Sequence, residues 1–331
     1  MTSLKGTKVL VTGADGFIGS HLVERLVELG ADVRAFCLYT STGSWGWLDA
    51  ASKQVRGALD VRLGDIRDAR FVASACEGVE VVFHLAALIA IPYSYLAPES
   101  FIDTNVKGTL NVLEAARAHG IKRVVHTSTS EVYGTPATIP IKETHALQAQ
   151  SPYAASKVAA DQLAMSYHRS FDVPVVVLRP FNTFGPRQSA RAVLPTIISQ
   201  MLSGARTIQL GRVDTRRDLT FVSDTVEGFV KAAVSDAVVG DVIQLGTGRT
   251  VSVQDMFDIL RKQLNIDVSI ELDPRRLRPD PSEVMVLLSD PALAGSRLGW
   301  TAEVSLEEGL SRTVAWTRSN LESFKTGFLH V

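Results

Sequence analysis

Tyr153 and Lys157 stand four residues apart in the segment SPYAASK (151–157). A proline suits the first turn of a helix, so both side chains are expected on one helix face, one turn apart. A lysine ammonium beside a phenol favours the phenolate and brings its pKa nearer to working pH. The pair is therefore predicted to act as a general base on a hydroxyl group. Without accompanying motifs, the same spacing would indicate an ordinary surface pair.

Small hydroxyl side chains form a second candidate group, in the segment HTSTSEVYG (126–134). It includes Thr129, Ser130 and Glu131, and it should lie at the carboxyl end of a strand. Open α/β sheets bind ligands at that edge. The hydroxyls could bond a substrate oxygen. The structural alternatives are turn chemistry for the hydroxyls and a helix or turn cap for Glu131.

The segment GADGFIG (13–19) places three glycines, Gly13, Gly16 and Gly19, around Phe17 and Ile18. It directly follows a strand-like run and opens a helix-like run. Glycines are needed there because the backbone must approach a pyrophosphate at the helix N-terminus. This placement predicts a dinucleotide-binding site rather than a plain tight turn.

The acid expected about 20 residues after such a turn, which binds the adenosine ribose, is missing. Cys37, Leu38 and Tyr39 occupy that region, which has neither a carboxylate for NAD nor an arginine for a 2′-phosphate. NAD is the preferred prediction, and NADP stays open. Asp65, at the end of a later strand, either accepts a bond from the adenine amino group or caps the next helix.

Alternating short β-branched runs and amphipathic segments must position these groups. The expected strands span residues 8–13, 32–38, 61–65, 81–86, 123–129 and 173–180, and the expected helices span 17–30, 67–77, 100–119 and 152–171. Gly30, Gly78 and Gly120 should close helices in left-handed conformations. The pattern predicts an α/β fold with a doubly wound parallel sheet of the Rossmann type.

The regular pattern ends after Pro180. A dinucleotide-binding domain is expected over residues 1–180 and about 218–248. A smaller C-terminal lobe that binds substrate is expected over residues 181–217 and 249–331. Two lobes also suit the chain length of 331 residues.

Composition restricts the possible partners and location. A formal net charge of −1 provides no field that would attract nucleic acid or an anionic membrane. Cys37 and Cys76 form neither a disulfide framework nor a metal-ligand cluster, so no metal and a cytoplasmic location are expected. No signal peptide or membrane-spanning segment is predicted.

Seven motifs occur in an order that resembles the extended short-chain dehydrogenase/reductases acting on nucleotide sugars, the NAD-dependent epimerase/dehydratase family. They are GxxGxxG, HLAA (84–87), TNVKGT (104–109), STSEVYG (128–134), SPYAASK (151–157), RPFNTFGP (179–186) and RRDLTFV (216–222). The resemblance covers nearly the whole chain. It implies cofactor contacts from Asp65, Ile66, Leu85, Ala86 and Ala87, in addition to the glycine-rich segment, Tyr153 and Lys157.

Within that family, the run Thr129-Ser130-Glu131 resembles nucleotide-sugar 4,6-dehydratases, most closely the GDP-mannose type. The segments SWGWLD (44–49) and ALIAIPYSY (87–95) further resemble dehydratases of GDP- or UDP-N-acetylglucosamine. The resemblance implies that Tyr153 removes the C4 hydroxyl proton, assisted by Lys157 and Thr129. Glu131 then removes the C5 proton, and water leaves C6 with help from Glu131 or Ser130.

The same resemblance implies a nucleoside-diphosphate sugar as substrate and a homodimer. Asn182 matches the family position that bonds the diphosphate. Arg217 and Arg278 are further candidates because a guanidinium binds phosphate in a bidentate manner, with a solvated surface position as the alternative for each. The helices expected at 100–119 and 152–171 match those that pair across the family's dimer interface.

Three other functions stay open. A 4-epimerase uses the same oxidation at C4 but needs no base at C5. UDP-glucuronate decarboxylases also carry the STSEVYG run, although their tyrosine–lysine motif differs. A cofactor-binding sensor without catalytic activity is disfavoured by the intact Thr129, Tyr153 and Lys157.

Overall fold

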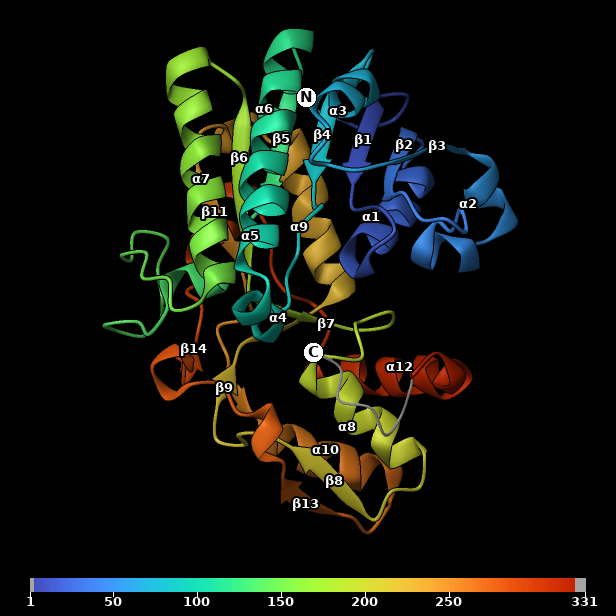
Figure 1. The fold of residues 1–331 in the computed structure, drawn as a ribbon, viewed down its shortest axis with the longest axis vertical. Helices are drawn as coiled ribbons and strands as arrows, with labels where there is room; N and C mark the ends of the chain where they lie inside the picture. The colour runs from blue at the N-terminus through green and yellow to red at the C-terminus, as the bar shows by residue number, and fades with distance from the viewer. Residues whose placement is uncertain (1–2, 325–331) are drawn as a thin grey trace.

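The computed structural model describes residues 3–324 and contains a central sheet of seven parallel strands (Figure 1). Their order is β11-β6-β5-β4-β1-β2-β3. The strands are β1 (Lys8–Thr12), β2 (Asp32–Leu38), β3 (Leu59–Gly64), β4 (Val81–His84), β5 (Arg123–Thr127), β6 (Val175–Pro180) and β11 (Val242–Leu245). The predicted fold class is confirmed, and each of the six predicted strands ends within two residues of its expected bounds.

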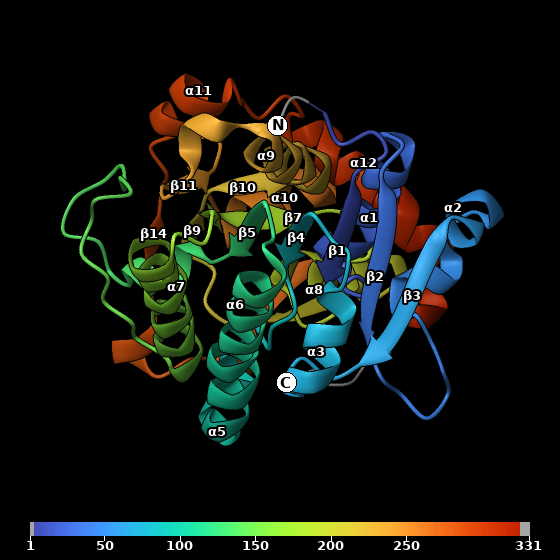
Figure 2. The same ribbon diagram turned by 90° about the horizontal axis from the view of Figure 1, so that it is seen from above.

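Helices cover both faces of this sheet (Figure 2). The first face carries α1 (Phe17–Glu28) and α9 (Val222–Val234), and the second carries α3 (Ala69–Cys76), α6 (Gly108–His119) and α7 (Pro152–Phe171). Alternate residues of β1 belong to the hydrophobic cores on opposite faces of the sheet. Val9 and Val11 pack in the core under α1 and α9, and Leu10 packs in the core under α3, α6 and α7. Burial on both faces explains the near-continuous apolar strands.

The helix predicted over residues 100–119 is confirmed in its extent, but a π-helical turn interrupts it. The chain forms α5 (Pro98–Phe101), a π-helical turn (Ile102–Lys107) and α6. Asn105 lies buried in the wide turn, where its amide exchanges hydrogen bonds with the backbone of Leu88 and donates to Ser156 Oγ at 2.9 Å. Single π turns often occur at functional sites, and this one ties α7 to the loop after β4.

The glycine signals at helix ends are confirmed. Gly30, Gly78 and Gly120 all have positive φ, between 60° and 76°. Two short helices between β2 and β3 had no recognised signal in the sequence: a 3-10 helix (Gly46–Ala50) and α2 (Lys53–Gly57). They lengthen the connection beside the glycine-rich turn.

Elements after β6 form a smaller region below the main sheet in Figure 1. Within residues 3–324 it contains three small sheets and three α-helices, while α9, β11 and α11 return to the main sheet. The strands are β7 (Asn182–Phe184) with β10 (Leu219–Phe221), β9 (Arg216–Arg217) with β12 (Val251–Ser252) and β14 (Val286–Leu287), and β8 (Thr207–Leu210) with β13 (Ser269–Leu272). The helices of this region are α8 (Val193–Leu202), α10 (Val253–Leu264) and α12 (Leu306–Ser319), whereas α11 (Ala292–Leu298) packs against β11 and α9 (Figure 2).

Both cysteines are buried and free. No helix within residues 3–324 is long and apolar enough to cross a membrane. Over the same range, no group of three or more His, Cys, Asp or Glu side chains is arranged to hold a metal ion.

Candidate active site

Most of the predicted site residues follow the carboxyl ends of strands in the main sheet, whereas Arg217 and Arg278 lie in the smaller region. Strand β1 lies between β2 and β4, so the chain order reverses at the β1–β4 boundary. Doubly wound sheets bind ligands in the crevice at such a switch point. The glycine-rich turn follows β1, residues Leu85–Ala87 follow β4, and Thr129 follows β5.

The turn between β1 and α1 fits a nucleotide diphosphate. Gly13 has a φ of 68°, and a Cβ on it would lie 2.8 Å from the nitrogen of Ala86. A Cβ on Gly19 would overlap the carbonyl oxygen of Gly13. Helix α1 begins at Phe17 after Gly16, which makes no side-chain capping bond. The helix N-terminus, including the backbone of Phe17 and Ile18, is therefore suited to bind an anion through backbone N–H groups.

We expect Gly19→Ala to weaken NAD binding by about tenfold or more. The new methyl group must push the turn away from α1, and such overpacking costs about 1–3 kcal/mol. Isothermal titration with NAD measures the change. Gly57→Ala is the control, because a Cβ there meets no atom within 4 Å. Unchanged affinity in Gly19→Ala would contradict the fit.

The loop after β4 is fixed against this turn by Thr12. Its hydroxyl accepts hydrogen bonds from the backbone nitrogens of Leu85 and Ala86, both at 3.1 Å, and contacts His84 Nδ1 at 2.8 Å. Leu85, Ala86 and Ala87 are partly buried. The loop thus forms one wall beside Gly13.

Asp65 and Ile66 lie just after β3, further along the same edge. Asp65 accepts bonds from the backbone and guanidinium of Arg67, and this partner holds the pKa of Asp65 below its usual value. Asp68, not Asp65, caps α3 by accepting from the nitrogens of Arg70 and Phe71. The alternative reading of Asp65 as the helix cap is therefore wrong, and its adenine contact stays a prediction.

Tyr153 and Lys157 project from the first turns of α7 and are buried. Ser151 caps this helix by accepting from the nitrogen of Ala154. Lys157 Nζ donates to the carbonyl oxygen of Thr127 at 2.6 Å, and the side chain of Thr129 is near enough to Tyr153 to lower the pKa of the phenol. The ends of β5 and α7 thus bring Thr129, Tyr153 and Lys157 together.

The prediction that Lys157 draws the pKa of Tyr153 towards neutrality is wrong for this structure. Burial raises the pKa of Tyr153 well above its usual value, while the side chain of Thr129 opposes this and the charges of Glu131 and Asp161 add to it. Burial also lowers the pKa of Lys157 to about 8, against the opposing charge of Asp161. Sequence spacing showed the pair but not its burial.

Glu131 lies in a short 3-10 helix (Ser130–Tyr133) that begins beside the catalytic pair. Thr129 caps this helix by accepting from the nitrogen of Glu131 at 3.2 Å, so Glu131 is not itself the cap. The negative charge of Glu131 acts on the phenol of Tyr153 and on the guanidinium of Arg217. Ser130 is buried. The carboxylate of Glu131 is therefore near enough to influence the pKa values of both Tyr153 and Arg217.

The two candidate phosphate ligands, Arg217 and Arg278, share one carboxylate that the sequence did not single out. Glu283 Oε1 lies 3.4 Å from Arg217 Nη2 and 3.5 Å from Arg278 Nη1. Burial lowers the pKa of Arg217, so a solvated surface position is wrong for this residue. Asn182 Oδ1 is buried and has no hydrogen-bond partner within residues 3–324. Such a polar atom is suited to bind a ligand.

A buried polar network lies beneath the catalytic pair. Asp161 is one turn beyond Lys157, and its Oδ2 accepts from Arg179 Nη2 at 2.9 Å and from Ser128 Oγ at 2.7 Å. His126 Nε2 lies 3.3 Å from Asp161 Oδ1. Asp161 thus supplies the buried negative charge between two buried cations, Arg179 and Lys157.

Asp161→Asn is expected to lower the free energy of unfolding by about 3–5 kcal/mol, because it leaves buried cations without their counter-charge. Urea unfolding followed by circular dichroism measures this. The control is Glu308→Gln, which breaks the exposed pair with Arg312 and should cost about 0.5 kcal/mol or less. Equal effects of the two substitutions would exclude the proposed charge compensation.

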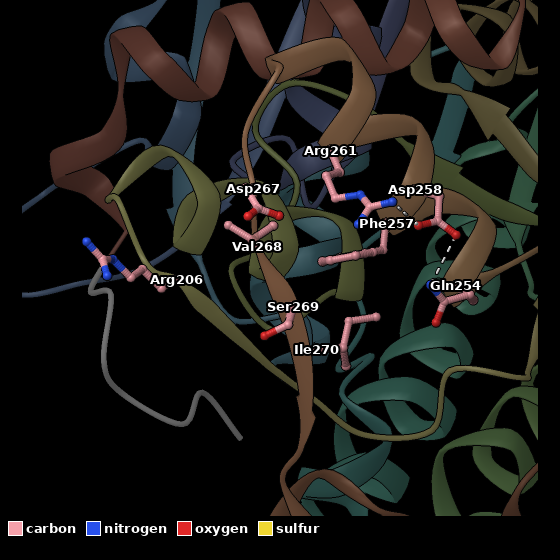
Figure 3. Close-up of a pocket in the computed structure, with 9 residues that line it drawn as sticks. All are labelled: Arg206, Gln254, Phe257, Asp258, Arg261, Asp267, Val268, Ser269 and Ile270. Atoms are coloured by element: carbon pink, nitrogen blue, oxygen red, sulfur yellow. Dashed lines mark hydrogen bonds and ion pairs between the residues drawn. The ribbon is translucent and has the colours of Figure 1, made fainter.

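A separate groove lies in the smaller region between α10 and β13 (Figure 3). Its polar side chains contact one another: Asp258 accepts from Gln254 at 3.1 Å and lies 3.7 Å from Arg261. None of the residues lining it belongs to the cluster around Tyr153. The catalytic cluster, not this groove, is therefore the candidate active site.

Comparison with known proteins fits this geometry. The family described as GDP-mannose 4,6 dehydratase matches residues 10–313. The chain belongs to this family. The membership confirms the resemblance to extended short-chain dehydrogenase/reductases drawn from the ordered motifs, and the chain is an enzyme of the nucleotide-sugar dehydratase and epimerase type.

Relatives of this family member divide between two reactions. The UDP-glucose 4-epimerase of Mycolicibacterium smegmatis is 35% identical over 317 residues, covering 94% of this chain and 99% of the relative. The dTDP-glucose 4,6-dehydratase of Streptomyces griseus is 35% identical over 320 residues, covering 94% of each. Identity alone therefore does not select between dehydration and epimerisation.

A solved relative shows a bound cofactor and substrate in the same fold. The UDP-glucuronic acid 4-epimerase from Bacillus cereus, in complex with UDP-glucuronic acid and NAD, superimposes with a TM-score of 0.86 at 27% identity. The match covers 95% of this chain and 100% of that one.

Proposed function

We propose that the protein is a nucleotide-sugar 4,6-dehydratase that uses NAD. The observation that carries this proposal is the position of Glu131, which follows Thr129 at the end of β5 and donates from its backbone nitrogen to the Thr129 hydroxyl at 3.2 Å, on the side of the site where Tyr153 lies. Oxidation at C4 needs one base, and removal of the C5 proton needs another. Tyr153 and Glu131 provide the two in one cluster.

The chain's own residues divide the chemistry as follows. Tyr153, with Thr129 beside it, takes the proton of the C4 hydroxyl. When bound, oxidised NAD supplies the acceptor for the C4 hydride, a positive charge that favours the phenolate, and later the hydride for C6. The 4-keto group then acidifies the C5 proton, which passes to the carboxylate of Glu131.

Loss of water completes the elimination. The protonated Glu131 returns its proton to the C6 hydroxyl, which leaves as water, and the buried Ser130 hydroxyl can support that transfer. Hydride return to C6 from the bound cofactor, together with delivery to C5 of the proton that Tyr153 took, directly or through solvent, would then give the 6-deoxy-4-keto sugar and restore Tyr153. The cofactor ends each cycle oxidised, so no net NADH is formed.

The substrate class proposed is a nucleoside-diphosphate sugar. Arg217 and Arg278 meet at Glu283, and a diphosphate could replace this carboxylate as their partner because it offers more acceptor oxygens. Asn182 Oδ1 is a buried acceptor without a hydrogen-bond partner within residues 3–324, which suits a donor group of a bound ligand such as a sugar hydroxyl. The crystallised relative bound to UDP-glucuronic acid supports this class.

A homodimer through α6 and α7 is proposed as the working form. These helices lie side by side on one face of the sheet (Figures 1 and 2). Leu110 and Phe171 lie at least partly exposed on them, which suits a helical interface. Light scattering at micromolar concentration measures the oligomeric state. A cytoplasmic location also stays a prediction.

The test of the proposed reaction is the product mass from a panel of GDP-, UDP- and dTDP-linked sugars. A dehydratase yields a product lighter by one water molecule without accumulating NADH. A 4-epimerase, the second candidate, yields a product of unchanged mass, and a decarboxylase releases carbon dioxide from a uronate. Either of these outcomes would overturn the proposal.

A further inference from the structure

A carboxylate from the glycine-rich turn lies at the end of β2. Asp15 Oδ2 accepts a hydrogen bond from the backbone nitrogen of Leu38, the last residue of that strand, at 3.3 Å. From the other side, the nitrogen of Trp47 donates to the carbonyl oxygen of Asp15 at 3.1 Å. A Cβ on Gly46 would lie 2.8 Å from Asp15 Cβ. Asp15 is thus held between two segments.

This is the region where dinucleotide-binding folds normally present an acid to the adenosine ribose. Here Cys37 is buried at the end of β2 and Tyr39 is exposed. The Cys37 thiol lies beside Asp15: burial first, and then the charges of Asp15 and Asp49, raise the pKa of Cys37 to about 12. The end of β2 carries no acid of its own. The carboxylate of Asp15, from the turn between β1 and α1, therefore lies where that acid would be expected.

We propose that Asp15 binds the adenosine ribose hydroxyls and selects NAD over NADP. The inference rests on the proposed use of a nicotinamide dinucleotide. A carboxylate accepts hydrogen bonds from a 2′-hydroxyl but repels a 2′-phosphate.

The residues around Asp15 also favour NAD over NADP. Asp49 adds a second carboxylate to this region, bonded to Ser44 Oγ at 2.6 Å and to the nitrogen of Trp45 at 3.2 Å. No lysine or arginine occurs between residues 37 and 49 to neutralise a 2′-phosphate. The turn that binds the diphosphate therefore also carries the selectivity for the nucleoside.

The test compares dissociation constants of NAD and NADP by isothermal titration, using full-length protein freed of bound nucleotide. The wild type should prefer NAD by about tenfold or more. In Asp15→Asn, which keeps an acceptor for Leu38, the preference should fall by about tenfold. Asp15→Ser serves as a second variant that also removes the charge. Asp32→Asn, at the exposed opposite end of β2, is the control and should keep the wild-type preference.

The outcomes separate two kinds of failure. An unchanged preference in a folded Asp15 variant, or a wild type that prefers NADP, would overturn the role of Asp15 while leaving the dehydratase proposal in place. A wild type that binds neither dinucleotide would overturn the proposed function together with this inference.

Discussion

Tyr153→Phe is expected to lower turnover by about 10²- to 10⁴-fold while leaving NAD binding nearly unchanged. The substitution removes only the phenolic oxygen, which lies near Thr129 and is needed to take the C4 hydroxyl proton. The ring remains and still packs against Phe101. The measurement is the rate of product formation from the best nucleotide sugar, together with the dissociation constant for NAD.

Tyr167→Phe is the matched control for that experiment. Tyr167 lies on the same helix, and its hydroxyl bonds Glu114 away from the cluster. Loss of the Tyr167 hydroxyl should leave turnover near the wild-type value. If Tyr153→Phe kept wild-type turnover, another group would have to remove the C4 proton and the assigned site would be wrong.

Glu131→Gln is expected to lower formation of the dehydrated product by about 10²-fold or more, yet leave oxidation at C4 intact. Glutamine keeps the size of the side chain but cannot accept the C5 proton. Mixing the variant with substrate should therefore still reduce bound NAD, seen as absorbance of the reduced nicotinamide, and should release little dehydrated sugar. The reduced state should persist longer than in the wild type.

The control for Glu131 is Glu143→Gln, which changes another partly buried carboxylate. Glu143 accepts from the nitrogen of Gln244 at 3.1 Å, and glutamine can keep that bond. Its turnover should stay close to the wild-type value. A Glu131→Gln variant that dehydrates substrate at the wild-type rate would show that Glu131 has only a structural role.

The predictability of this molecule from its sequence depends on how local each feature is. Valine-rich strands, the glycine-rich turn and the Pro152-started helix carry their signals within a few residues, so the parallel sheet and the helix Pro152–Phe171 were predicted closely. The π turn within the helix over 100–119 was not predicted, because it depends on the buried contacts of Asn105 with Leu88 and Ser156, which are distant in the chain.

The candidate site also combines residues with local sequence signals and residues whose roles depend on distant contacts. Thr129, Tyr153 and Lys157 belong to recognisable motifs and meet in the structure. Asp161 and Glu283 were missed, because each matters through arginines far away in the chain, Arg179 and Arg217. The pKa direction of Tyr153 depends on burial, and the carboxylate at the end of β2 comes from Asp15, so sequence spacing could predict neither.

The most direct test of the dehydratase assignment is the position of solvent deuterium in the product formed in heavy water. Because Glu131 must remove the C5 proton and C5 is later protonated again, the wild-type product should lack the C6 hydroxyl and carry deuterium at C5, as nuclear magnetic resonance would show. A product that retains its C6 hydroxyl and carries no deuterium at C5 would contradict the assignment.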